Sequence, residues 1–403
     1  MKKIYTVFDY LEWRGDLTFS KSPLNEVDSL ILSMCAFINF AGIVPSFGRE
    51  ETIGFPEAIE RFSKMPETFR RFGVLIPRET ETLATVAAHC ARFRGIRLSN
   101  FVNRVDEKRE MQFCAVTYHL PDGSLFIAFR GTDDTLVGWK EDMDLSYRDY
   151  IPAQAEAVSY TEHVCESYPG KLRLGGHSKG GNLAIYTAVH ARNEVRERLV
   201  MAYSHDGPGF QRHILESDRY REMQAKLITF IPQSSIVGVA LDHDEHYHII
   251  SSAGSRLLQH DPFSWEIHGT SFVYLRERSG FGKRTARAVR NWLVSLNNED
   301  RAFFTETFYR LLQASRKKTL TDINNDRLRT MLAAHKELRK LESKDRSRFH
   351  GILKQLVANL NRRDPKPSQI PLAAGAEDDT IPTVGAGKPS RNDKGTKPPR
   401  AKK

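Results

Sequence analysis

Cysteine is scarce in this 403-residue chain, which contains four copies. Cys35, Cys90, Cys114 and Cys165 lie in apolar or helix-forming surroundings, and no two of them form a C-x-x-C pair. This distribution is typical of reduced, structural thiols in a reducing compartment. We therefore expect a cytoplasmic protein.

Long hydrophobic runs are also missing. No segment reaches the roughly eighteen consecutive apolar residues of a membrane span, and the first nine residues lack the apolar stretch of a signal peptide. The segment nearest to a membrane span, 30–44, is uncharged but interrupted by Ser33, Asn39 and Gly42. We interpret it as a buried helix, and the alternative is a lid or a lipid-contacting helix.

Positive charge is in excess, but much of the excess is local. The formal net charge is +10, and the last sixteen residues, from Lys388, hold seven Lys or Arg and one Asp. Basic tails bind anionic surfaces weakly and without sequence preference. We therefore expect no specific nucleic-acid partner, and at most a weak contact with an anionic membrane surface.

The pattern of elements divides the chain into three predicted parts. Residues 1–270 begin with helices and continue with strands alternating with helices, residues 271–363 are helical, and residues 364–403 form a basic tail predicted to be disordered. Alternating strands and helices predict an α/β fold with a largely parallel sheet covered on both faces. Expected elements include a helix over 211–224 and a last hairpin formed by 247–252 and 256–258.

The segment 171–184 contains the pattern G-x-S-x-G as G-H-S-K-G at 176–180. A strand is expected before it and a helix from about Asn182 to Arg192 after it. In such a strand-to-helix elbow the serine is strained and its hydroxyl projects above the sheet. The start of the helix favours negative charge that develops there. Ser178 is therefore the candidate nucleophile for attack on a carbonyl carbon.

A serine hydroxyl needs a base within hydrogen-bond reach, and histidine has a suitable pKa. His260 is the preferred base because it follows the last expected hairpin, where the order Ser…Asp…His places it. His177 is expected to point away from the nucleophile. The remaining alternatives are His205, His243, His246 and His248.

Several motifs together resemble the class 3, fungal-type lipases of the α/β-hydrolase group. They are Phe129-Arg-Gly-Thr132, Trp139 and the G-H-S-x-G-G elbow. The opening segment 8–19 resembles more closely a bacterial lipase-like family without an assigned function, to which the motifs at 180–184, 206–210, 231–238 and 259–265 are also similar. This resemblance covers residues 1 to about 270. It implies an α/β-hydrolase fold with a helical N-terminal segment. The helical C-terminal extension lies outside the resemblance and is predicted from its helical spacing alone.

The acid of the catalytic triad departs from the lipase pattern. The resemblance places it after the strand that ends at 231–235, where this chain has Ser235. Asp206 ends the preceding strand, where other α/β-hydrolases carry their acid, and it is the preferred candidate. Its structural alternative is a turn residue before Gly207-Pro208. The other candidate acids are Asp242, Asp244 and Glu245.

For the oxyanion, the lipase resemblance points to the backbone N–H of Thr132, with its hydroxyl as a further donor, and to the N–H of Lys179. The Lys179 ammonium is expected either at the mouth of the site, where it would attract an anionic head group, or in solvent near the helix start.

These features predict a serine hydrolase that cleaves a carboxylic ester and needs no metal or cofactor. A lipid or lysophospholipid acyl ester is the first expected substrate, and a soluble acyl ester or thioester is the second. The alternative is a catalytically silent α/β-hydrolase-fold protein with a binding or regulatory role, which the serine at 235 and the basic helical tail favour.

Overall fold

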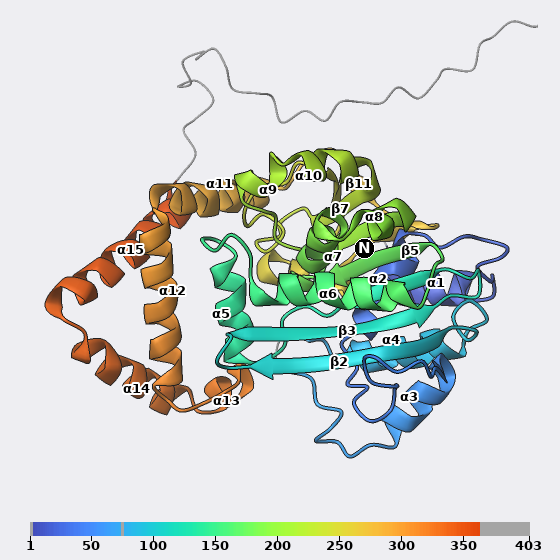
Figure 1. Cartoon of the computed structure of the whole chain (residues 1–403). Coiled ribbons are helices and arrows are strands. Elements are labelled where there is room, and N and C mark those ends of the chain that lie inside the picture. Colours follow the sequence, from blue (N-terminus) through green and yellow to red (C-terminus); the bar gives the residue numbers. More distant parts are fainter. Residues whose placement is uncertain (1–2, 74–75, 363–403) are drawn as a thin grey trace, which may run out of the picture. The chain divides into compact units, whose positions relative to one another are not determined.

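A nine-stranded sheet runs through the computed structural model, which describes residues 3–73 and 76–362 (Figure 1). Its strand order is β1-β2-β3-β4-β5-β6-β7-β8-β11. The strands are β1 (Ile53–Gly54), β2 (Arg97–Asp106), β3 (Met111–His119), β4 (Leu125–Phe129), β5 (Leu172–His177), β6 (Leu199–His205), β7 (Leu227–Pro232), β8 (His246–Ile250) and β11 (Tyr274–Leu275). The tail predicted from residue 364 lies outside the described residues.

The five central strands, β4 to β8, pair in parallel, whereas the strands at both edges of the sheet pair antiparallel. The predicted α/β class is confirmed, and parallel pairing is confined to the centre. Since parallel strands end at the same edge of a sheet, the segments that follow β4, β5, β6 and β7 all emerge on one side.

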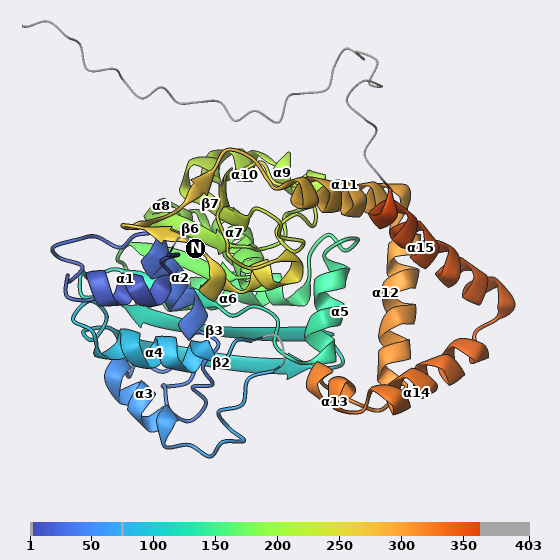
Figure 2. The same ribbon diagram turned by 180° about the vertical axis from the view of Figure 1, so that it is seen from behind.

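Helices cover both faces of this sheet. The helices α1 (Val7–Arg14), α2 (Glu26–Cys35), α3 (Phe55–Ser63) and α4 (Glu79–His89) share one hydrophobic cluster with it, on the face seen in Figure 2. The helices α6 (Pro152–Glu166), α7 (Lys179–His190), α8 (Asn193–Arg198) and α10 (Asp218–Met223) contribute to a second cluster on the opposite face.

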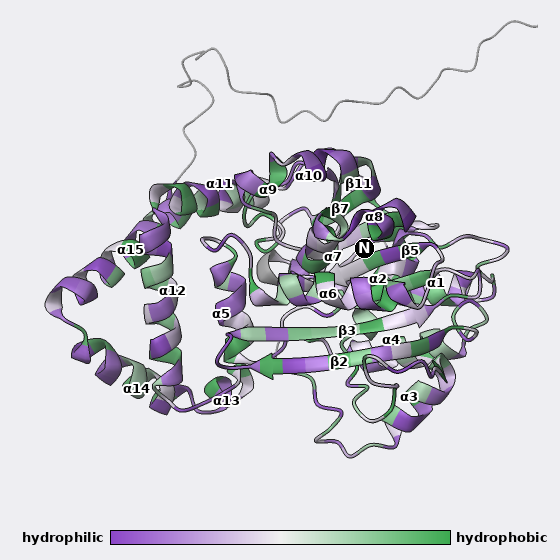
Figure 3. Cartoon of the chain, viewed as in Figure 1, coloured by the Kyte–Doolittle hydropathy of each residue, from purple (hydrophilic) through white to green (hydrophobic). Residues whose placement is uncertain are grey.

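Strand β3 contributes side chains to both hydrophobic clusters. Cys114, Val116 and Tyr118 belong to the first cluster, while Phe113 and Ala115 belong to the second. This alternation is the period-two pattern of a strand. Because both faces are covered, β3 is hydrophobic along most of its length (Figure 3).

Of the uncharged stretch 30–44, residues 30–35 form the end of α2, so the predicted buried helix is confirmed there. Residues 36–44 form turns and irregular structure, and for them the helix prediction is wrong. Asn25 caps this helix by accepting hydrogen bonds from the N–H groups of Val27 and Asp28, at 2.9 and 3.1 Å. Every residue from Val27 to Cys35 is buried. Within the described part of the chain, no helix combines the length and the apolar character needed to cross a bilayer.

Two local predictions are wrong. The hairpin expected at 247–252 and 256–258 does not form, because β8 pairs with β11 instead, while Arg256–His260 is the 3-10 helix η2. The Gln259 side chain holds this segment through the Ser234 N–H and the Gly254 carbonyl. The helix expected over 211–224 is split into α9 (Arg212–Leu215) and α10, which Ser217 caps through the Tyr220 N–H.

The helices predicted beyond residue 272 are present from Gly280. They are α11 (Gly280–Ser295), α12 (Asn298–Gln313), α13 (Leu320–Asn325), α14 (Arg327–Lys340) and α15 (Ser343–Asn361). Helix α12 packs against α5 (Leu136–Asp144), which follows β4. The C-terminal helices also share a third hydrophobic cluster, which includes Leu296, Phe304 and Phe349.

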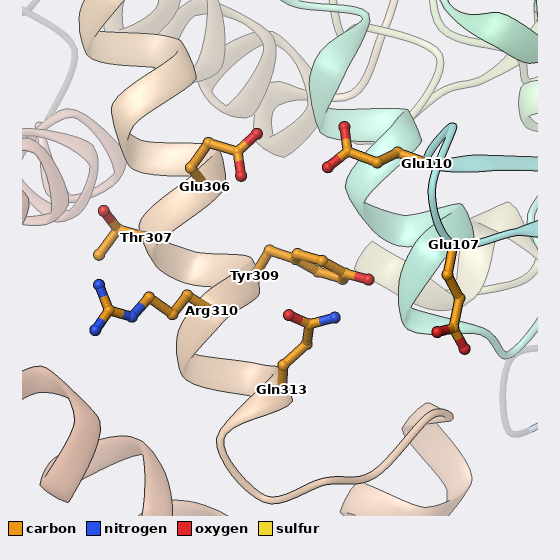
Figure 4. A pocket seen from close by; sticks show the side chains of 7 residues that line it. All are labelled: Glu107, Glu110, Glu306, Thr307, Tyr309, Arg310 and Gln313. Carbon is orange, nitrogen blue, oxygen red and sulfur yellow. The ribbon is translucent and has the colours of Figure 1, made fainter.

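Lysine 140 on α5 anchors α12 to the body of the protein. Its buried ammonium lies 2.7 Å from carboxylates of Glu110 and Glu306, which face each other across an acidic cavity of about 470 Å³ (Figure 4). Burial alone would lower the pKa of Lys140, but these carboxylates and Asp144 outweigh it and raise that pKa. This polar contact holds the extension against α5.

Candidate active site

Four of the residues singled out from the sequence lie at the carboxyl edge of the central strands. Thr132 follows β4, Ser178 follows β5, Asp206 follows β6 and Ser235 follows β7. In open α/β sheets this edge is where ligands bind.

Ser178 has the backbone geometry of a strained elbow. It joins β5 to α7 with φ 59° and ψ −132°, and its side chain is only partly buried. The flanking glycines leave room for this turn: a Cβ on Gly176 would lie 2.2 Å from the Gly180 carbonyl carbon, and one on Gly180 would lie 2.1 Å from the Phe129 oxygen. A non-glycine residue in this region of φ is strained, and such residues cluster at functional sites.

Asp206 and His260 are brought together from 54 residues apart. The His260 Nδ1 atom lies 2.7 Å from Asp206 Oδ2, and the carboxylate is completely buried. Ser235 donates its hydroxyl hydrogen to the same Oδ2 atom at 2.8 Å, and the Gly238 N–H donates to Ser235 Oγ at 3.1 Å. The serine at 235 is therefore a hydrogen-bond partner of the carboxylate that the preceding strand supplies.

The other candidate acids make different contacts. Asp242 forms ion pairs with Arg212 and Arg290, Glu245 accepts hydrogen bonds from Tyr220 and Thr229 and pairs with His243, and Asp244 is exposed. Of these four acids, Asp206 is the one that contacts His260 among the described residues.

His177 supports the backbone of His260. Its Nε2 atom donates a hydrogen bond of 2.9 Å to the His260 carbonyl oxygen, and the two rings lie 4.5 Å apart. Burial lowers the pKa of His177 well below its usual value, so its ring is neutral. The sequence predicted only that this side chain points away from Ser178. Its contact to His260 had no sequence signal, because the partners are 83 residues apart.

No hydrogen bond joins the side chains of Ser178 and His260 in the described part of the chain. The connection runs through His177, which precedes Ser178 and holds the His260 carbonyl. Hydrogen bonds between a nucleophile and its base are often long in ligand-free structures and tighten when the substrate binds.

The N–H groups of Thr132 and Lys179 have no hydrogen-bond acceptor among the described residues. Gly131 brings the first of these loops against the elbow, because a Cβ there would lie 3.1 Å from Ser178 Cβ. The Thr132 hydroxyl donates to Asp142 Oδ2 at 2.5 Å, so its hydrogen is directed at this carboxylate. Burial raises the pKa of Asp142 to about 6, although Lys179 and Thr132 oppose the shift.

Both expected locations of the Lys179 ammonium are wrong. The side chain is buried, and its Nζ atom lies 2.8 Å from Glu141 Oε2, 2.7 Å from Gln112 Oε1 and 3.0 Å from the Gln112 carbonyl oxygen. These partners, Glu141 on α5 and Gln112 on β3, hold the ammonium inside the protein, away from the mouth of the site. The lysine thus ties the start of α7 to two neighbouring elements.

The model of the Mbeg1-like family matches residues 87–310, which is more than half of the chain and includes Ser178, Asp206 and His260. The chain belongs to the Mbeg1-like family. No curated protein matches it. Among solved structures, it is similar to the crystal structure of M37 lipase, with 12% identity over 54% of this chain and 70% of that one, and a TM-score of 0.35.

No group of three or more His, Cys, Asp or Glu side chains in the described part of this Mbeg1-like chain is placed to hold a metal ion.

His205 is a buried histidine directly before Asp206. Its Nε2 atom lies 2.9 Å from Ser29 Oγ, and its Nδ1 atom has no partner among the described residues. Burial lowers its pKa to about 3. The ring therefore stays neutral in the folded protein, whereas in the unfolded chain it takes up a proton below about pH 6.5.

This difference makes the folded protein less stable in acid. Between pH 6.5 and 3 the unfolded chain binds one more proton at His205 than the folded protein does. The free energy of unfolding therefore decreases by about 1.4 kcal/mol for each unit by which the pH is lowered. From pH 6.5 to 5 we expect the wild type to lose about 2 kcal/mol more than a His205→Asn variant, measured by urea unfolding. Parallel pH profiles for the two proteins would contradict this assignment.

Proposed function

We propose that this Mbeg1-like protein is a serine hydrolase with an α/β-hydrolase fold that cleaves carboxylic esters. The observation that carries the proposal is the 2.7 Å contact between His260 Nδ1 and the buried Asp206 carboxylate, at the same sheet edge as the strained Ser178. A buried aspartate on one ring nitrogen leaves the other nitrogen free to act as a base.

In the proposed mechanism, Ser178 Oγ attacks the ester carbonyl carbon while His260 Nε2 takes the hydroxyl proton. Asp206 holds the Nδ1–H and stabilises the imidazolium that forms. The tetrahedral intermediate then collapses, and His260 returns the proton to the departing alcohol oxygen. Water, activated by the same histidine, attacks the acyl-enzyme, releasing the carboxylic acid and restoring Ser178.

The N–H groups of Thr132 and Lys179 are the proposed donors to the oxyanion. Both are unpaired among the described residues, and Lys179 opens α7, whose first N–H groups have no acceptor within the helix. Each such donor is worth about 3 kcal/mol of transition-state stabilisation. The Thr132 hydroxyl is assigned to Asp142 instead.

A lipid or lysophospholipid acyl ester is the first proposed substrate class, and a soluble acyl ester or thioester is the second. The resemblance of the 129–132 motif and of the elbow to class 3 lipases supports the first class.

A fluorophosphonate probe tests the proposal directly, because it reacts with an activated serine. We expect the probe to label the wild type at Ser178, with labelling lost in Ser178→Ala and kept in a Ser167→Ala control, where the serine is exposed and remote from the elbow. Peptide mass spectrometry would locate the label. If the folded wild type stayed unlabelled beside a reactive control hydrolase, the catalytically silent alternative would replace this proposal.

A further inference from the structure

A second cavity, of about 170 Å³, lies where the C-terminal helices meet the body of the protein. Helix α5, the loops after β6 and β7, and the helices α11 and α12 all contribute to its walls. Its walls include Asp142, Pro208, Leu241, Trp292, Leu293 and Phe304. Figure 1 shows α5, α11 and α12 at the same end of the sheet.

Two of these wall residues connect the cavity to the candidate active site. Asp142 accepts the hydrogen bond of Thr132, which is the proposed oxyanion residue, at 2.5 Å. Pro208 follows Gly207, where a Cβ would lie 2.9 Å from the carbonyl oxygen of Ser178. The cavity is therefore bordered by two segments, α5 and the loop after β6, that each contact the candidate active site.

The chemistry of the walls fits an uncharged chain. Leucine, valine, proline and aromatic side chains dominate them. The cation in the wall, Arg301, is already engaged, because its guanidinium donates to the carbonyl oxygens of Leu293 at 2.5 Å and Ser146 at 2.7 Å. Asp142 would repel an anion that entered the cavity. A neutral hydrocarbon group is thus the ligand that the cavity can accept.

We propose that this cavity binds the acyl chain of the substrate and that the C-terminal helices set the length of chain that fits. This inference rests on the proposed hydrolase function. A dry apolar cavity of about 150 Å³ holds one benzene molecule, so the cavity here suits a chain of about four to eight carbons. Esters with much longer chains have no room in the cavity and react more slowly.

Helix α11 supplies the wall of the cavity that limits the length of the acyl chain. Trp292 is fixed by a hydrogen bond of 3.2 Å from its Nε1 atom to the Ile352 carbonyl on α15, and its ring meets the Phe304 ring edge-on at 5.5 Å. Leu293 is half-buried and lines the cavity, whereas the next residue, Val294, is 75% exposed. The two neighbours therefore form a matched pair for testing.

The test measures kcat/KM for p-nitrophenyl esters from acetate to dodecanoate. For the wild type we expect a maximum between about four and eight carbons. Leu293→Trp, which fills the cavity, should lower the ratio of kcat/KM for hexanoate to that for acetate by about tenfold or more. Val294→Trp should keep the wild-type profile. Val289→Phe, which narrows the same wall, provides a second variant if Leu293→Trp does not fold.

A binding experiment separates this inference from the proposed function. Methyl hexanoate is titrated into Ser178→Ala protein by calorimetry, with and without Leu293→Trp. Binding that Leu293→Trp abolishes supports the cavity even if the wild type hydrolyses no ester, in which case the hydrolase proposal alone fails. Ester hydrolysis with an unchanged chain-length profile in both filling variants, or an equal loss for all esters, overturns the cavity proposal and leaves the hydrolase standing.

Discussion

Replacing Asp206 with asparagine is expected to lower kcat for ester hydrolysis by about 10⁴-fold, because an amide cannot hold the catalytic tautomer of the histidine. Among the described residues, the carboxylate that contacts His260 is Asp206, at 2.7 Å, and it is completely buried. An asparagine at 206 can donate an N–H toward His260 Nδ1, which would move the ring proton to the nitrogen that must accept it from Ser178. The measurement is steady-state kinetics with a short-chain p-nitrophenyl ester.

Asp242→Asn is the matched control for this variant. Asp242 was an alternative acid, but its carboxylate pairs with Arg212 and Arg290 at distances of 3.8 and 3.0 Å. We expect its kcat to stay within about twofold of the wild type, since partly exposed ion pairs contribute little. Near-normal activity in Asp206→Asn, together with a large loss in Asp242→Asn or Glu245→Gln, would assign the acid elsewhere. Unchanged unfolding curves for both variants would confine the effect to catalysis.

The sequence was sufficient for the elbow and for the position of the central strands along the chain, because both depend on local patterns. Alternating apolar residues and the glycines at 176 and 180 indicate the turn that places Ser178 at φ 59°. Because Asp206 comes at the end of an expected strand, the sequence placed it at the carboxyl edge of a parallel sheet, where ligands bind. These rules link a residue to its neighbours along the chain, so a single sequence contains them.

Contacts between segments that are far apart in the chain could not be predicted from the sequence. The Lys179 ammonium was expected near solvent, yet its partners, Gln112 and Glu141, lie 67 and 38 residues away. The same limit applies to η2, which the Gln259 side chain holds against the loop after β7 instead of a hairpin. A lysine after the nucleophile looks the same in sequence whether it is buried or exposed. Only the packing of α5 against β3 decides between them.

Replacing Lys179 with methionine is expected to lower the free energy of unfolding by about 3–5 kcal/mol, because it leaves the buried Glu141 carboxylate without its cation. Both side chains are completely inaccessible, and their charged atoms lie 2.8 Å apart. Methionine keeps the length of the side chain and the helix propensity, so the loss would report on the charge. The measurement is urea denaturation, with Lys171→Met, an exposed lysine before β5, as the control.

A double variant distinguishes two causes of this loss of stability: the missing attraction between Lys179 and Glu141, and the cost of burying the Glu141 carboxylate without a cation. In Lys179→Met with Glu141→Leu, no charge of the pair remains buried, and much of the stability should return. The recovery should be incomplete, because Glu141 also accepts hydrogen bonds from the N–H groups of Gln112 and Ala153, at 3.0 and 2.8 Å. A loss below about 1 kcal/mol in the single variant, as for an exposed pair, would contradict the buried pairing. Since Lys179 also carries a proposed oxyanion N–H, a double variant that regains stability but not activity would show that the lysine side chain positions the backbone of the elbow.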